Sequence, residues 1–102
     1  MTRRPLPNRR SQMTISTHHN GHRFEASFGL FEDGTPAEVF ICATKPGGDF
    51  HVLANDAAIV LSLALQHGVP LETIRRAVGR DSQGRAQSIV GTAVDAFANE
   101  VA

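Results

Sequence analysis

The residues best suited to binding a ligand form the run Lys45-Pro46-Gly47-Gly48-Asp49, which separates a predicted strand from a predicted helix. Its two glycines let the backbone approach a ligand closely, and the start of a helix offers free N–H groups and a partial positive charge. The lysine adds a formal charge, which favours an anion such as a phosphate. Arg9 and Arg10 could complete the site across an interface between copies. One hypothesis is therefore an oligomeric protein that binds, and so sequesters, a nucleotide or cyclic nucleotide.

The same run also has a purely structural interpretation. It lacks the spacing of a Walker loop or of a dinucleotide-binding fingerprint. A turn from strand to helix needs glycines in any case, and Asp49 is a suitable N-cap for the helix that follows. The pattern favours this second interpretation, because many helix starts bind nothing.

The histidines and the single cysteine indicate no metal site. His18, His19 and His22 crowd into one predicted turn, but the sequence contains neither a cysteine pair nor an HExxH pattern that would give zinc its four ligands. Cys42 lies in a strand that is apolar on both faces, where we expect it to be buried and inert. One cysteine also excludes an intramolecular disulfide.

The carboxylates show no spacing with a histidine that would define an acid–base pair, so we predict no catalytic residue. Asp56 differs from the others because it falls at or beside the apolar stripe of the central helix. A paired role for this carboxylate is open, and a solvated position at the edge of the stripe is the interpretation that the pattern favours.

The element that must position these residues is a helix predicted over 50–67. The apolar residues of its expected buried face recur at helical spacing, at Phe50, Leu53, Ala54, Ala57, Leu61, Ala64 and Leu65. A second apolar set, Val52, Ile59, Val60 and Leu63, runs up the other side, so more than one neighbour must cover the helix. Gly68 is suited to end this helix with a positive φ, and Pro70 to begin the next. The second helix, with its stripe Leu71, Ile74 and Val78, completes a helical hairpin.

Strands precede the helices. Alternating patterns predict strands at 13–17, 22–30 and 37–43, joined by a turn at 18–21 and by the hairpin signal Asp33-Gly34. A polar loop at 79–85 leads to a third helix over 89–101. The fold class is therefore α+β, with a small antiparallel meander of about three strands, a helical hairpin and a C-terminal helix. Because the third strand is apolar on both faces, we expect a homo-oligomer, a dimer or higher.

Composition limits the remaining possibilities. The 102 residues suit a single domain over 13–102, and their formal charges cancel, so neither DNA nor a membrane surface is an expected partner. Residues 1–12 form a basic N-terminal arm, which we expect to be disordered alone or laid over a partner. With no membrane-spanning run and no apolar signal sequence after the arginine-rich start, a cytoplasmic location is expected.

Most of the chain resembles the C-terminal TSCPD domain of adenosylcobalamin-dependent ribonucleotide reductases. The residues that carry the resemblance are LPNRRSQMT (6–14), GH (21–22), GLFEDGTPAEVFI (29–41), KPGG (45–48), Asp56, SLALQHGVPLE (62–72) and AQSIVGTAVDAF (86–97). The resemblance implies a small α+β module that occurs appended to the reductase and also as short free-standing proteins. The name-giving Thr-Ser-Cys-Pro-Asp stretch and a CxxC pair are both absent.

These departures determine the leading hypothesis. One cysteine cannot carry out dithiol chemistry alone, and the parent's catalytic barrel would need several hundred further residues. The resemblance therefore implies a stand-alone, non-catalytic module with an accessory or regulatory role in nucleotide metabolism. Its expected partner is a ribonucleotide reductase subunit, and the parent's cofactor, adenosylcobalamin, is not expected to bind this chain. An enzyme in its own right is supported only by the family's name.

Overall fold

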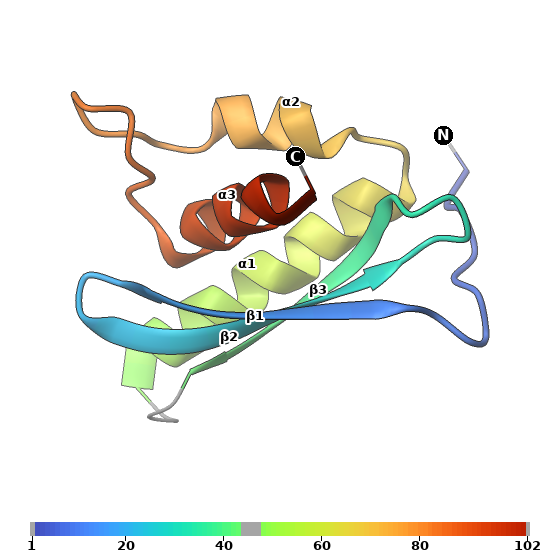
Figure 1. Ribbon diagram of the computed structural model, residues 1–102, viewed down its shortest axis with the longest axis horizontal. Coiled ribbons are helices and arrows are strands. Elements are labelled where there is room, and N and C mark those ends of the chain that lie inside the picture. The colour runs from blue at the N-terminus through green and yellow to red at the C-terminus, as the bar shows by residue number, and fades with distance from the viewer. Residues whose placement is uncertain (1, 44–47, 102) are drawn as a thin grey trace.

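The computed structural model describes residues 2–43 and 48–101, which form a three-stranded antiparallel sheet covered on one face by three helices (Figure 1). The elements, in chain order, are β1 (Gln12–His19), β2 (His22–Leu30), β3 (Pro36–Ala43), α1 (Gly48–Gln66), α2 (Leu71–Ala77) and α3 (Ile89–Val101). The sheet order is β1-β2-β3, while α1 packs along β3 and α3 crosses β1. The predicted α+β class and the order of its elements are confirmed.

Two tight turns make the meander. β1 runs two residues further than predicted, to His19, and the chain reverses at Asn20 and Gly21 with φ of 50° and 80°. The second reversal places Gly34 at φ 87°, where its N–H donates to the carbonyl of Phe31 at 2.9 Å. A positive φ costs glycine little, so the Asp33-Gly34 signal identified this turn correctly.

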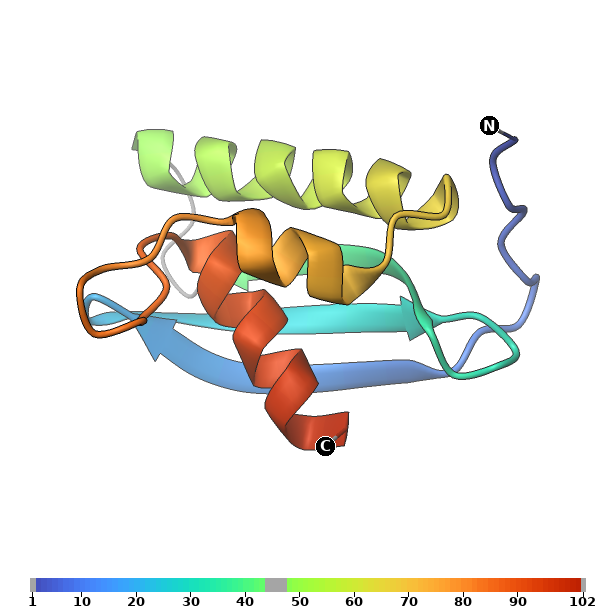
Figure 2. The same cartoon turned by 90° about the horizontal axis from the view of Figure 1, so that it is seen from above.

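The end of α1 follows the predicted pattern. Gly68 has a φ of 93°, and the N–H of Val69 donates to the carbonyl of Ala64, which satisfies one of the last free carbonyls of the helix. Pro70 then precedes α2, which runs in the direction opposite to α1 and rests on α3 (Figure 2). Leu71 and Ile74 of α2 are partly buried against the core, as their spacing predicted.

The core lies between the sheet and the helices. Phe24 and Phe28 of β2 are almost fully buried, and the ring of Phe28 lies 4.5 Å from that of Phe97 in α3. Val39 and Ile41 of β3 meet the buried face of α1. The residues that α1 contributes to this core are Ala54, Ala58, Leu61 and Leu65.

The predicted buried face of α1 was partly wrong. Leu53 was assigned to it but is 68% exposed, whereas Ala58 and Gln66 are buried in its place. The reason is the position of α1 along one edge of the sheet, which turns the stripe 54, 58, 61 and 65 toward β3. Asp56 is exposed, as its solvated interpretation predicted.

The second apolar set of α1 is not covered within the chain. Val52, Ile59, Val60 and Leu63 are between 42% and 67% exposed, and Figure 2 shows α1 at one border of the molecule with no other element beyond it. The face of the sheet opposite the helices is open as well, and there Phe40 is 53% exposed.

Truncating Leu61 tests the position of the core. Leu61→Ala should lower the free energy of unfolding by about 2–5 kcal/mol, because it removes a buried side chain and leaves a cavity. Val101→Ala, at an exposed apolar position of α3, should change it by less than about 0.5 kcal/mol. Urea unfolding followed by circular dichroism measures both, and equal effects would contradict the assignment of the core.

Candidate functional site

Arg9 and Arg10 do not lie beside Gly48 within one copy of the chain. Lys45 and Gly47 lie outside the described residues, and Gly48 is the first residue of α1. The arginine-rich arm lies at the other end of this 19-residue helix, about 27 Å away at 1.5 Å per residue. Arg9 and Arg10 could therefore join Gly48 only across an interface, and nucleotide binding by these residues stays a prediction.

Arg10 already has a partner in the chain. Its Nε donates to Oε2 of Glu38 at 2.5 Å and one Nη to the carbonyl of Pro7 at 2.6 Å. Glu38 is only 6% exposed and lies across Gly29, where an added Cβ would come within 2.5 Å of Oε2. Gly29 therefore makes room for a carboxylate whose charge Arg10 compensates, because a buried carboxylate without a partner is costly.

The rest of the arm lies on the domain of its own chain. Arg3 Nε donates to the side-chain oxygen of Gln66 at 2.6 Å, and the N–H of Arg4 donates to the carbonyl of Gln66 at 2.7 Å. The Arg4 guanidinium sits 3.8 Å from the centre of the Phe31 ring, beside Glu32 and Asp33. These contacts join the arm to the end of α1 and to the turn before β3.

Two side chains of α1 form hydrogen bonds with free backbone groups along the outer edge of β3. The Val39 N–H donates to Ser62 Oγ at 2.8 Å, and this hydroxyl in turn donates to the carbonyl of Ala58 at 2.8 Å. One turn later, Gln66 Nε2 donates to the carbonyl of Ala37 at 3.0 Å. An edge strand otherwise leaves such groups unpaired, so Ser62 and Gln66 close part of this edge.

Sequence reasoning missed the role of Ser62 and Gln66, although the sequence carried a signal for it. They are polar residues spaced i, i+4 within a helix that is apolar on most sides, so they share a face where solvent is not the expected partner. Both belong to the run SLALQHGVPLE on which the family resemblance partly rests.

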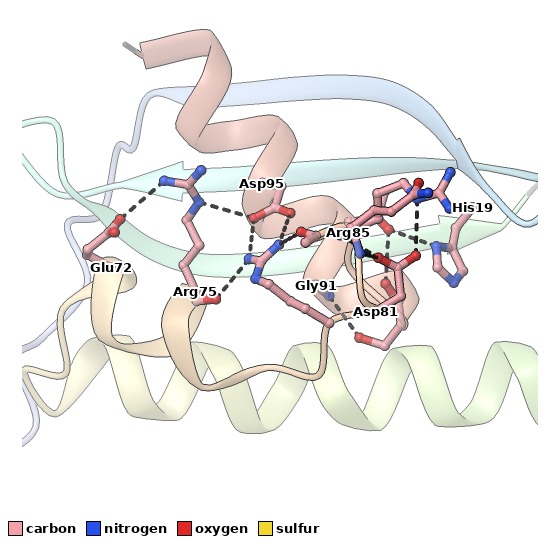
Figure 3. A network of polar contacts seen from close by, with 12 residues as sticks. His19, Glu72, Arg75, Asp81, Arg85, Gly91 and Asp95 are labelled. Atoms are coloured by element: carbon pink, nitrogen blue, oxygen red, sulfur yellow. Dashed lines mark hydrogen bonds and ion pairs between the residues drawn. The ribbon is translucent and has the colours of Figure 1, made fainter.

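A polar network joins α2, α3 and the loop between them (Figure 3). Asp95 of α3 accepts from Arg80 at 2.7 Å on each carboxylate oxygen and from Arg75 Nε at 3.1 Å. The hydrogen bond from Arg80 is the main reason that the pKa of Asp95 lies below its ordinary value. The same pairing raises the pKa of the Arg80 guanidinium, so both groups stay ionised and hold the loop after α2 against α3.

Asp81 organises the loop itself. Its Oδ1 accepts from the backbone N–H groups of Arg85 and Gln83 at 3.0 and 2.9 Å, and these bonds lower the pKa of its carboxyl. Oδ2 pairs with Arg85 Nε at 3.1 Å. The carboxylate thus folds the loop 79–85 into a turn that the sequence predicted only as polar.

His19 ties the β1–β2 turn to the start of α3. Its Nδ1 lies 2.8 Å from Thr92 Oγ1 and its Nε2 lies 3.2 Å from the carbonyl of Gln87. Sequence reasoning gave His19 no such contact. Beside it is a hollow of about 610 Å³ whose lining includes His18, Asp81, Arg85, Thr92 and Asp95.

The polar side chains of the described residues form hydrogen bonds and ion pairs with one another that stabilise the fold. None of their buried polar atoms lacks a hydrogen-bond partner, and no three or more histidine, cysteine, aspartate or glutamate side chains among them are placed to share a metal ion. Cys42 was expected to be buried, but it is exposed. It projects from the face of β3 opposite Val39 and Ile41, which no helix covers, and its register partner there is Glu25.

The comparison with known families now identifies the module. The model of the TSCPD domain matches residues 2–98, which is nearly the whole chain and includes the arm. The chain belongs to the TSCPD domain family. The resemblance inferred from the sequence is therefore confirmed, and the arm with its contacts to Gln66 lies within the matched region.

Similar proteins are named vitamin B12-dependent ribonucleotide reductases. The chain is 44% identical over 70 residues to the one from Agrobacterium fabrum, covering 69% of this chain and 6% of that protein. It is 38% identical over 72 residues to the one from Rhodopirellula baltica, covering 71% of this chain and 7% of that protein. The TSCPD chain thus spans a small part of the length of these relatives. No solved structure matches it.

Four hollows that the described residues line have volumes of about 340–610 Å³, within the range that drug-sized ligands occupy. Among the described helices, none has the length and apolar character needed to cross a membrane.

Removing the Ser62 hydroxyl tests the closed edge of β3. Ser62→Ala should lower the free energy of unfolding by about 1–3 kcal/mol, because the part-buried Val39 N–H loses its acceptor. Ser82→Ala, at an exposed position of the loop, is the control and should have almost no effect. Hydrogen exchange of the Val39 amide should also become faster, and unchanged protection would contradict the proposed contact.

Because the pKa of Asp95 is lowered in the folded chain, the free energy of unfolding should depend on pH. In the unfolded chain its carboxyl has the ordinary pKa of about 3.9, and the folded value is lower. Its stabilising contribution is therefore present above pH 3.9 and is lost as the pH falls through the folded pKa. Asp95→Asn should lower the free energy of unfolding at pH 7 by about 1–3 kcal/mol, and this difference should shrink in acid.

Urea unfolding across a pH series measures this effect. Glu100→Gln is a matched control, because it removes an exposed carboxyl from the same helix without touching Arg75 or Arg80. A loss for Asp95→Asn that is the same at pH 7 and at pH 2 would show that the ion pair is not its cause.

Proposed function

We propose that this TSCPD chain is a non-catalytic module that works as a separate polypeptide with a vitamin B12-dependent ribonucleotide reductase, in an accessory or regulatory role. The observation that carries the proposal is the match of residues 2–98 to one domain that such reductases contain. In the reductases from Agrobacterium fabrum and Rhodopirellula baltica the matching segment is only 6–7% of the protein. A module of this size is suited to modify an enzyme rather than to replace it.

The chemistry of the described residues supports a role without catalysis. The ion pairs of Arg10, Arg80 and Arg85 are used to hold the arm, the helices and the loop in place. Reduction of a ribonucleotide consumes two electrons, and a dithiol that supplies them needs two cysteines, whereas Cys42 is the only one in the chain. These observations support a role in binding a partner.

The shape of the surface favours a protein as the ligand. Small molecules bind in concave pockets that bury most of their surface, whereas protein partners bind flatter areas with an apolar centre and a polar rim. The open face of the sheet is of the second kind, since Phe40 and Cys42 are exposed there beside Ser27 and Glu25. A reductase subunit is the partner that the family membership suggests.

Binding to two forms of a reductase tests the proposal. The purified chain is titrated into a vitamin B12-dependent reductase and into the same reductase lacking its TSCPD segment, and calorimetry gives the affinity for each. We expect tighter binding to the shortened form, because its docking surface is then unoccupied. We also expect the chain to change the rate of ribonucleotide reduction while having no turnover alone.

Two outcomes would overturn the proposal. The first is the absence of binding to either reductase at about 100 µM, a concentration that reveals even weak complexes. The second is a rise in the unfolding temperature with nucleotides and no reductase binding, which would favour the nucleotide-binding alternative. A true ligand at about 100 times its Kd adds about 2.7 kcal/mol of stability.

A further inference from the structure

We propose that two copies of this chain associate through the outer side of α1 to form a two-fold dimer. The outer side of α1 is defined by its exposed apolar residues Val52, Leu53, Ile59, Val60 and Leu63. This interface does not depend on the reductase, so it is a property of the chain by itself.

The first argument is the composition of α1. Residues 52, 56, 59 and 63 follow one another at helical spacing, and 53 and 60 continue the same side, so this surface is a continuous stripe with Asp56 as its one carboxylate. The opposite side of α1 forms the core with β3. A helix that is apolar on nearly all sides is typical of a helix buried on all sides, and within one copy only half of α1 is covered.

The second argument is area. Without any residue of the sheet, the outer side of α1 exposes roughly 500 Å² of large apolar residues, which lies within the range for the largest patch on a typical monomer. Two such surfaces together give roughly 1,000 Å², about the least area that a specific interface needs. A second copy therefore offers an area sufficient for a reversible dimer.

The surface also continues past the helix. A groove of about 340 Å³ follows α1 beside β3, and its lining includes Ile59, Leu63, Phe40 and Leu6 of the arm. Part of the β3 edge is closed by Ser62 and Gln66, which makes pairing of β3 strands between copies an unfavourable route to association. Helix-to-helix packing remains available on this side of the molecule (Figure 2).

The third argument is the position of the polar groups. Asp56 and His67 are eleven residues apart, about three helical turns, so they lie on the same side of the helical path. If two α1 helices pack antiparallel about a two-fold axis midway between these residues, Asp56 of one copy faces His67 of the partner subunit. The symmetry repeats this contact on the other side of the axis. His67 Nδ1 lies 2.8 Å from the Leu63 carbonyl, and its Nε2 is the ring nitrogen that can meet a carboxylate. Val60 and Leu63 are then nearest the axis.

Sedimentation velocity from about 1 to 100 µM tests the dimer. We expect a species of twice the 11.0 kDa chain mass, which dissociates on dilution. Val60→Glu should weaken dimerisation at least about tenfold, because it places two carboxylates near the axis. Thr73→Glu is the matched control on the exposed surface of α2 and should dimerise like the wild type. Circular dichroism establishes that both variants are folded.

A charge exchange tests the antiparallel pairing separately. Asp56→Lys should weaken the dimer, because it removes the acceptor that faces His67 of the partner subunit. Adding His67→Glu in the same chain should restore association, since a cation and a carboxylate then face each other across the interface. A folded wild type that is monomeric at about 100 µM, or a Val60→Glu variant that dimerises like the control, would overturn the dimer. Failure of the exchange to restore association would overturn the antiparallel pairing.

Discussion

The contact on which the other parts of the structure depend is the pair of hydrogen-bonding side chains that α1 offers to β3. Ser62 and Gln66 bind the backbone of Val39 and Ala37, so the helix is held along the strand rather than merely resting on it. This contact sets the rotation of α1 about its axis and therefore decides that Leu61 and Leu65 enter the core. It also creates a seat for the arm, because the remaining side-chain oxygen of Gln66 accepts from Arg3.

Charged pairs hold the segments that the core does not reach. α2 has no fully buried residue, and its position depends on Arg75 and Arg80 binding Asp95 of α3. The arm depends in the same way on Arg10 binding Glu38 across Gly29. Hydrogen bonds between ionised groups are stronger than those between neutral groups. They can therefore order such short segments even though these segments bury little apolar surface.

Local signals predicted the parts of this fold that local physics decides. Gly68 and the Asp33-Gly34 turn have the positive φ values that only certain residues adopt readily, and they were placed correctly. Leu53 and Cys42 were assigned to the interior because they are apolar, but their exposure depends on where α1 and the sheet meet, which no local pattern specifies. The contact of His19 with Thr92 joins residues 73 positions apart. Local residue spacing cannot predict such a contact either.

The two sides of α1 link stability to association. Its inner side builds the core of one copy, and on the proposed dimer its outer side is buried by the other, so a single helix serves both equilibria. A partner that binds only the folded chain stabilises it by mass action, and the stability of the module should then rise with its own concentration. A reductase that covered the same side of α1 would compete with the second copy, whereas one that bound the open face of the sheet would share with the dimer only the groove at Phe40. The position at which the reductase binds thus decides whether regulation and self-association exclude each other.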